Sequence, residues 1–285
     1  MNGGTCRRGY QMTRRGALAA AALAATFSLA PLSASAQEAS SVYQPTVGQR
    51  GKDVVWVPSP QALVDRMLEM AKASPADFLM DLGSGDGRTV ITAAKRGINA
   101  LGIEYNPDMV ELSRRNAEKE GVSAKAKFEK ADLFETDFSK AQVITMFLLP
   151  DINRRLRPRI LDLKPGVRVV SNTFDMGDWT PDEMAEAGGD CTSYCRALLW
   201  IVPAKVEGRW TGGDGEVALE QRYQMLTGSV RAGGSVHSIT QGKVNGENIV
   251  FTAGGVEYST RINGNAMEGK AKGPNGEKPF KVVRE

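Results

Sequence analysis

The sequence predicts an α/β fold with a mainly parallel sheet and helices on both faces, followed by a small C-terminal antiparallel β domain. Three observations carry this expectation. Apolar strand-like runs alternate with helical patterns between residues 54 and 204. The apolar run that ends at Asp81 leads into a glycine-rich turn and then a helical pattern. After residue 208, short alternating runs are separated by glycine turns, as in antiparallel hairpins.

Residues 1–36 have the pattern of an export signal. Four arginines and an apolar stretch from Ala17 to Leu32 are followed by Ala34-Ser35-Ala36, which supplies a cleavage site. Thr13-Arg14-Arg15 directly before the apolar stretch indicates a twin-arginine signal, which exports folded proteins. An uncleaved anchor and a mitochondrial presequence are the alternatives. We therefore expect a periplasmic or secreted protein that meets the membrane only during export.

Charge and composition give no reason to expect a nucleic-acid partner. The 285 residues carry a formal charge of +3, but cleavage after Ala36 removes four arginines and no acid, which changes the charge to −1. The basic excess therefore belongs to the leader. No metal site is expected either, because the only histidine, His237, is far in sequence from the two cysteines that remain after cleavage.

Those two cysteines, Cys191 and Cys195, lie in the segment GGDCTSYC. On one extended strand, four residues at about 3.3 Å each would separate their Cα atoms by more than the roughly 7 Å that a disulfide tolerates. A turn beside Gly188-Gly189 would bring them together. The sequence alone leaves the disulfide and two free thiols equally open.

The chain is expected to continue after the leader as an extended arm, residues 37–53, and an α/β domain, residues 54–204. The first helix starts at Ser59-Pro60, an N-cap followed by a proline at the first helical position. Apolar residues from Leu63 to Ala71 then recur at helical spacing. The further predicted elements are strand Phe78–Asp81, helix Thr89–Lys95, strand Ala100–Glu104, helix Pro107–Glu120, strand Ala126–Phe128, strand Val143–Leu149, helix Ile152–Leu163 with a kink or break at Pro158, strand Val167–Val170 and strand Leu198–Val202.

A linker at residues 203–208 separates this domain from a β-rich module, residues 209–285. Asn245-Gly246 and Asn263-Gly264 are strong hairpin signals, so we expect an antiparallel meander or a small closed barrel. Its role would be stabilising or partner-binding, and His237 would face solvent. The clearest strand-like runs are Val217–Gln224, Leu226–Val230, Ile249–Thr252, Val256–Ile262 and Met267–Ala271.

The glycine turn narrows the choice of ligand. Glycine is needed where the backbone takes a positive φ or approaches a ligand closely, and here it recurs at Gly83, Gly85 and Gly87. A dinucleotide fingerprint G-x-G-x-x-G would place its third glycine where Arg88 stands, which disfavours a nicotinamide oxidoreductase. Glu104 follows Gly83 by 21 residues, close to the spacing of a ribose-binding acid.

The pattern D-x-G-x-G-x-G resembles motif I of the class I S-adenosylmethionine (SAM) methyltransferases, which have a Rossmann-like sheet. With VWVPSP, GIEYNP, ADLFETDF, LLPDIN and NTFDMGDW, the resemblance covers residues 54–204 and points to a bacterial branch similar to the non-SET protein-lysine methyltransferases. That group includes mitochondrial enzymes that act on an ATP synthase component. Its nuclear histone-lysine members carry paired asparagines after strand four, where this chain has Leu149-Pro150-Asp151.

The resemblance implies SAM as the cofactor. In that family the glycine loop passes under the methionine and ribose parts of the cofactor, the acid at the position of Glu104 binds the ribose, and an Asp at the position of Asp132 often accepts a hydrogen bond from the adenine amino group. The residues expected to bind the cofactor are Pro58, Asp81, Gly83, Ser84, Gly85, Gly87, Glu104, Tyr105, Asn106, Asp132 and Leu133.

Methyl transfer requires the acceptor and the methyl group to be close and aligned. Because ligands of such sheets lie beyond the carboxyl ends of the strands, residues after strands four and five should face the methyl group. They are Pro150, Asp151, Asn153, Asn172 and Asp175, of which Asp151 and Asn172 are the catalytic candidates. Trp179 either forms a wall of the acceptor pocket or belongs to the core.

Two classes of function remain at this point. The leading hypothesis is an exported SAM-dependent methyltransferase whose methyl acceptor, a protein or a small molecule, is unknown, with a protein lysine as one candidate. The alternative is a non-catalytic SAM-binding or interaction protein whose β-rich module binds a partner. The oligomeric state is not set by the sequence.

Overall fold

The structure, a computed structural model, describes Met1 and residues 43–189, 191–213 and 215–285. The predicted leader and the first part of the arm lie outside these residues, apart from Met1. Tyr43–Glu285 form one compact unit. Within the part of the chain that is described, no helix is both long and apolar enough to cross a membrane.

Seven strands form one sheet in the order β3-β2-β1-β4-β5-β7-β6. Strand β7 pairs antiparallel with β5 and β6, and all other neighbours are parallel. The predicted mainly parallel sheet is therefore confirmed. The strands are β1 (Phe78–Leu82), β2 (Asn99–Glu104), β3 (Ala126–Lys130), β4 (Val143–Met146), β5 (Arg168–Asn172), β6 (Glu183–Glu186) and β7 (Arg196–Ile201).

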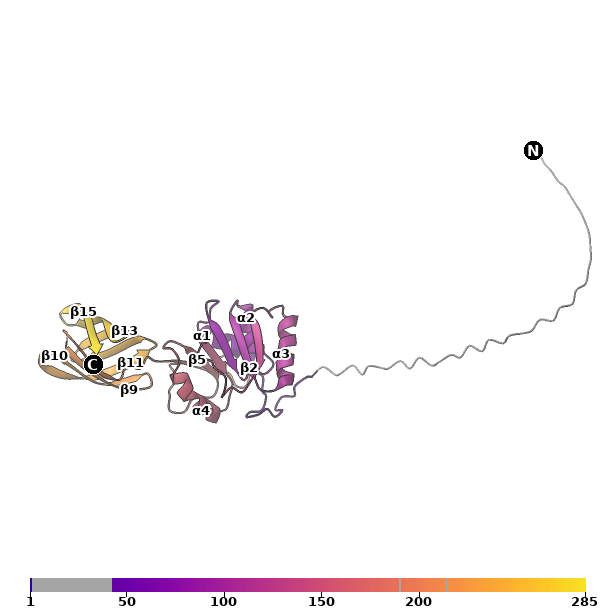
Figure 1. Cartoon of the computed structure of the whole chain (residues 1–285), viewed down its shortest axis with the longest axis horizontal. Helices are drawn as coiled ribbons and strands as arrows, with labels where there is room; N and C mark the ends of the chain where they lie inside the picture. Colours follow the sequence, from indigo (N-terminus) through magenta and orange to yellow (C-terminus); the bar gives the residue numbers. More distant parts are fainter. Residues whose placement is uncertain (2–42, 190, 214) are drawn as a thin grey trace, which may run out of the picture. The chain divides into compact units, whose positions relative to one another are not determined.

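Helices cover both faces of this sheet (Figure 1). Residues of α1 (Gln61–Met70), α2 (Arg88–Lys95) and α3 (Pro107–Lys119) share one apolar cluster with the strands. Residues of α4 (Pro150–Leu161) belong to a second apolar cluster with the strands. Helix α4 begins two residues earlier than predicted and continues through Pro158, so the expected break is wrong.

The C-terminal part is a closed barrel of eight antiparallel strands in the order β10-β11-β12-β13-β14-β15-β8-β9 (Figure 1). Closure pairs each of these described strands on both sides, so the barrel presents no free sheet edge among them. The interior is filled by apolar side chains, with Trp210 fully buried among them. The strands are β8 (Gly208–Gly212), β9 (Gly215–Arg222), β10 (Met225–Ala232), β11 (Ser235–Asn245), β12 (Asn248–Ala253), β13 (Val256–Asn263), β14 (Ala266–Gly273) and β15 (Gly276–Arg284).

Trp179 connects the sheet to the barrel. Its side chain is fully buried, stacks on Tyr223 with ring centroids 5.8 Å apart, and donates a hydrogen bond from Nε1 to Gln224 Oε1 at 2.9 Å. Tyr223 and Gln224 form the turn between β9 and β10. Trp179 is therefore core, which settles the choice that the sequence left open.

Candidate functional site

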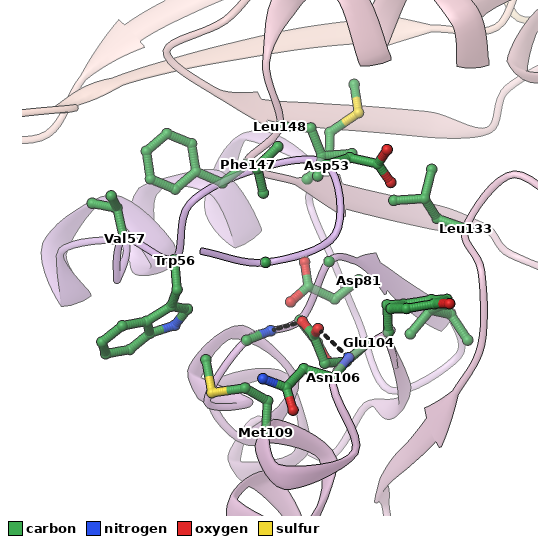
Figure 2. Close-up of a pocket in the computed structure, with 18 of the residues that line it drawn as sticks. Asp53, Trp56, Val57, Asp81, Glu104, Asn106, Met109, Leu133, Phe147 and Leu148 are labelled. Carbon is green, nitrogen blue, oxygen red and sulfur yellow. Dashed lines mark hydrogen bonds between the residues drawn. The ribbon is translucent and has the colours of Figure 1, made fainter. Parts of the chain in front are cut away.

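A cavity lies at the carboxyl ends of β1, β2 and β4 (Figure 2). The glycine turn after β1, the end of β2, the turn after β3 and part of the N-terminal arm line it. All residues predicted to bind the cofactor line this cavity except Gly87. They are Pro58, Asp81, Gly83, Ser84, Gly85, Glu104, Tyr105, Asn106, Asp132 and Leu133.

The glycine turn leaves the floor of the cavity free of side chains. Gly83 and Gly85 have positive φ angles of 82° and 54°. A Cβ atom on Gly85 would lie 2.8 Å from Nε1 of Trp56, so only glycine fits between the turn and this indole. Helix α3 fixes the turn from behind, because the Ser113 hydroxyl donates to the Gly85 carbonyl at 2.8 Å.

Gly87 serves packing, which corrects its predicted role as a cofactor-binding residue. It precedes α2 with a φ of 83°, and a Cβ atom there would lie 2.7 Å from Cζ of Phe128. The neighbouring Arg88 donates to the Asp86 carboxylate at 2.6 Å and to the Ser59 carbonyl at 2.8 Å. The residue that rules out the dinucleotide fingerprint thus ties the glycine turn to the segment before α1.

Glu104 presents a carboxylate that is fixed at both oxygens. Oε2 accepts a hydrogen bond from the Gly85 amide at 3.0 Å, and Oε1 accepts one from the Asn106 amide at 2.9 Å (Figure 2). Asn106 in turn caps α3, since its Oδ1 accepts from the Asp108 amide at 2.9 Å. An ionised carboxylate has about four lone-pair sites, so Glu104 retains capacity to accept from a pair of hydroxyl groups.

Asp81 is a buried acid with a strongly perturbed pKa. Its side chain is only 6% exposed, and the hydroxyl of Thr145, its partner across the β1–β4 pairing, donates to Oδ1 at 2.7 Å. Burial raises the pKa of Asp81 to about 7, and the like charges of Asp86 and Glu104 add to this. Such a group can pair with a cationic ligand that restores the stability of its charged form.

The folded protein should lose stability as the pH rises from about 4 to about 7, because Asp81 stays protonated in the folded chain over this range and ionises in the unfolded chain. Each pH unit of this window is worth about 1.4 kcal/mol. Asp81→Asn should therefore raise the free energy of unfolding at pH 8 and change it little at pH 4. Urea unfolding at both pH values measures this, with Glu129→Gln on exposed β3 as the control. An equal effect of Asp81→Asn at both pH values would contradict the raised pKa.

Asp132 lines the cavity as predicted but already has partners. Its Oδ1 accepts from the Phe134 amide at 2.8 Å, and Lys52 Nζ donates to Oδ2. The hydrogen bond from Lys52 lowers the pKa of Asp132, which keeps the carboxylate ionised. Lys52 also lies 4.8 Å from the ring centroid of Tyr105. An adenine amino group at Asp132 would therefore share this carboxylate with Lys52 or displace it.

The N-terminal arm forms part of the site, although the sequence predicts only an extended segment. Residues 48–56 form a tight hairpin in which the Gly48 amide donates to the Trp56 carbonyl at 2.9 Å and the Gly51 amide donates to the Val54 carbonyl at 2.8 Å. Residues 49–59 line the cavity. Besides the arm, the lining includes Met109 and Phe147, which the sequence did not single out as site residues.

The residues predicted to face the methyl group have other places, and none of them lines the cavity. Asp151 is exposed at the start of α4 and pairs with Arg154. Asn172 is fully buried and donates to the Ser59 hydroxyl at 3.0 Å. Asn153 is also buried and donates to the backbone carbonyls of Phe174 and Asp175, both at 3.1 Å. Pro150 is the first residue of α4 and Asp175 closes a turn with the Gly177 amide.

These features fit a cofactor with a ribose and a positive charge. The side-chain-free glycine turn, the doubly anchored Glu104 and the buried Asp81 together offer a cradle, hydroxyl acceptors and an anion. Asp81 and Glu104 both point into the space between the arm and α3 (Figure 2). No group of three or more metal-binding side chains occurs in the described ranges.

Comparisons with known proteins agree with this geometry. Residues 81–183 match the family described as the ANTKMT methyltransferase domain. A protein-lysine N-methyltransferase of Saccharolobus islandicus (strain REY15A) is 46% identical over 134 residues, which cover 46% of this chain and 83% of the relative. A lysine N-methyltransferase of Homo sapiens that is named for a component of ATP synthase is 36% identical over 136 residues, which cover 47% of this chain and 58% of that protein.

Among solved structures, an RNA methyltransferase from Salinibacter ruber in complex with S-adenosyl-L-homocysteine is 44% identical, with a TM-score of 0.49. That match covers 53% of this chain and 96% of the other. The family match begins at Asp81, includes Glu104 and Asp132, and ends before the barrel. The chain spans less than two thirds of the human relative, so the activity of that whole protein does not follow from the match.

Proposed function

The chain belongs to the class I SAM-dependent methyltransferases, in the family of the archaeal protein-lysine N-methyltransferase, and on this premise we propose that it methylates lysine side chains of proteins after its export from the cytoplasm. The observation that carries the proposal is the cavity built on Glu104, Asp81 and the glycine turn in a chain 46% identical to that relative. Family membership also disfavours the non-catalytic binding protein.

SAM supplies a methyl group on a positively charged sulfur. Glu104 would hold the ribose hydroxyls, because both of its oxygens are already oriented by backbone amides. Asp81 would face the cationic amino-acid part, and its carboxylate would ionise on pairing with that charge. Asp132 would hold the adenine amino group in place of, or beside, Lys52. Trp56 and the rest of the arm exclude water from the glycine turn.

A lysine acceptor must lose its proton before its nitrogen can attack the methyl group. Phe147 and Leu148, which follow β4 and line the cavity, offer an apolar wall on the side away from Glu104 (Figure 2). Desolvation against such a wall lowers the pKa of an ammonium group and favours the neutral amine. Positioning and desolvation by these residues, without a dedicated base, are sufficient for the proposed reaction.

Incubation of residues 37–285 with methyl-labelled SAM and an extract of the cells that make the protein tests the acceptor. We expect the label in proteins, on N-methylated lysines identified by peptide mass spectrometry, and no label with the Glu104→Ala variant. Label confined to RNA or small molecules would contradict the lysine acceptor and leave methyl transfer standing. Absence of label in every fraction would contradict the enzyme itself.

Export is the second part of the proposal. It is supported by Arg14-Arg15 before the apolar stretch and by a disulfide between Cys191 and Cys195, since disulfides persist in oxidising compartments. The full chain should be found outside the cytoplasm, whereas the variant with Arg14→Lys and Arg15→Lys should remain inside. Cell fractionation measures this. Equal export of both chains would contradict the twin-arginine route, and wild-type protein found only in the cytoplasm would contradict export.

A further inference from the structure

The loop between β6 and β7 lies at the same edge of the sheet as the cavity. Strand β7 is antiparallel to β5, so its start, Ala197, pairs with Asn172 at the end of β5. The Thr173 amide donates to the Arg196 carbonyl at 2.7 Å, which ties the loop to the turn after β5. The chain that precedes β7 is therefore held beside the carboxyl ends of the parallel strands, where β4 and β5 end.

A disulfide closes this loop. Cys191 and Cys195 are bonded, with their Cα atoms 5.8 Å apart, so the structure settles the pairing that the sequence left open. The Ala187 amide donates to the Cys195 carbonyl at 2.7 Å, which closes the base of the loop. Between the cysteines, Tyr194 has a φ of 55°, a left-handed conformation that costs a non-glycine residue about 1–2 kcal/mol. Loop closure, and not a local preference, places this residue.

Tyr194 completes a cluster of three aromatic rings. Its ring centroid lies 5.1 Å from that of Phe147, in an edge-on arrangement, and 6.1 Å from that of Phe174. Phe147 and Phe174 are stacked with centroids 6.0 Å apart. Phe147 also lines the cofactor cavity, whereas Phe174 and Tyr194 do not. The cluster thus continues the cavity outward, and Tyr194 remains 40% exposed at its outer side.

We propose that Phe147, Phe174 and Tyr194 form the acceptor site and that the Cys191–Cys195 disulfide holds Tyr194 in it, so that binding of the acceptor, but not of the cofactor, requires the disulfide. The inference rests on the proposed lysine acceptor. Ring faces attract ammonium and methylammonium groups and cover the aliphatic stem of a lysine. The residues that build the cofactor side, Glu104, Asp81 and the glycine turn, take their hydrogen bonds from residues outside the described part of this loop.

Reduction opens the loop by a balanced exchange. A dithiol gives two electrons and two protons to the Cys191–Cys195 bond, which becomes two thiols, while the dithiol closes to a cyclic disulfide. Without the cross-link, the left-handed Tyr194 is free to relax away from Phe147. Because cytoplasmic thiols are kept reduced, the acceptor site would form only in an oxidising compartment. Methylation of cytoplasmic proteins before export is then suppressed.

Two binding measurements and one rate measurement on residues 37–285 test this. Calorimetry with S-adenosylhomocysteine reports the cofactor side, and calorimetry of that complex with Nα-acetyl-Nε-trimethyllysine amide reports the acceptor side without turnover. Label transfer to extract proteins at increasing extract concentration gives the acceptor dependence of the rate. Dithiothreitol, Tyr194→Ala and the pair Cys191→Ser with Cys195→Ser should each weaken the trimethyllysine affinity by about tenfold, as expected for a desolvated cation–π contact.

The same treatments should leave the affinity for S-adenosylhomocysteine unchanged, and Tyr194→Phe, which keeps the ring, should restore most of the acceptor affinity. The double-serine variant should not respond to dithiothreitol, which controls for unspecific effects of the reductant. Equal trimethyllysine affinity of the oxidised and reduced protein would overturn the inference, as would a parallel loss of cofactor affinity. Absence of any transfer together with a redox-dependent trimethyllysine affinity would count against the proposed function alone.

Discussion

Glu104→Ala is expected to weaken SAM binding by more than about tenfold. Hydrogen bonds to a charged group contribute about 1.5–3 kcal/mol each, and the variant removes both acceptor oxygens from the ribose side of the cavity. It also frees the amides of Gly85 and Asn106, which the carboxylate holds at 3.0 and 2.9 Å. The glycine turn would lose part of its orientation in addition to the direct contact.

Calorimetry with SAM and with S-adenosylhomocysteine measures the effect of Glu104→Ala. Glu129→Ala is the matched control, because Glu129 lies opposite Ile103 on neighbouring β3, is exposed, and does not line the cavity. Glu104→Gln keeps the size of the side chain and isolates the charge. Unchanged affinity of Glu104→Ala would remove the ribose assignment and, with it, the cofactor site as described.

Trp179→Ala is expected to lower the free energy of unfolding by about 3–5 kcal/mol, the range for removal of a buried large aromatic side chain. Trp179 is fully buried, stacks on Tyr223 and bonds Gln224, both of which belong to the barrel turn. Its backbone carbonyl also accepts from Nε1 of Trp200 at 2.7 Å. The loss should therefore affect the sheet and the barrel together.

Urea unfolding of residues 37–285, followed by near- and far-ultraviolet circular dichroism, measures this. Trp56→Ala is the control, since Trp56 is half-buried and lies in the arm, away from the barrel. A loss from Trp179→Ala no larger than that from Trp56→Ala would contradict the contact between sheet and barrel. Two separate transitions in the wild-type protein would mean that the two parts unfold independently.

The cofactor side of the site was predictable because its signals are local. A strand that ends in an acid, a turn that needs positive φ angles and a helix start occupy residues 78–88, and each has its own residue preference. Glu104 could be assigned because it ends the next strand at a known distance from Gly83. In a parallel sheet the carboxyl ends of neighbouring strands meet at one edge, so sequence order was enough to bring these residues together.

The remaining features depend on contacts between distant segments. Strand β6 was missed because Glu183–Glu186 is a short polar edge strand with no apolar alternation. Strand β11 was missed because most of its first residues are exposed and its pairing is interrupted by a register shift after Thr240. Gly87 was misassigned because its constraint, Phe128, comes from β3.

The acceptor side was the least predictable part. Asp151 and Asn172 have the positions that strand order suggests, but the first is exposed on α4 and the second is buried beneath Ser59. Tyr194 reaches Phe147 only because the β6–β7 loop is closed by a disulfide. No periodicity in the sequence encodes that approach, since it requires the fold of β7 against β5.

A crystal structure of residues 37–285 grown with S-adenosylhomocysteine would test the central claim most directly. We expect the ligand in the cavity at the carboxyl ends of β1, β2 and β4, with its ribose hydroxyls within hydrogen-bonding distance of the Glu104 carboxylate and its sulfur on the side of Phe147. A ligand bound elsewhere, or a ribose that does not touch Glu104, would contradict the assignment of this cavity as the methyl-donor site.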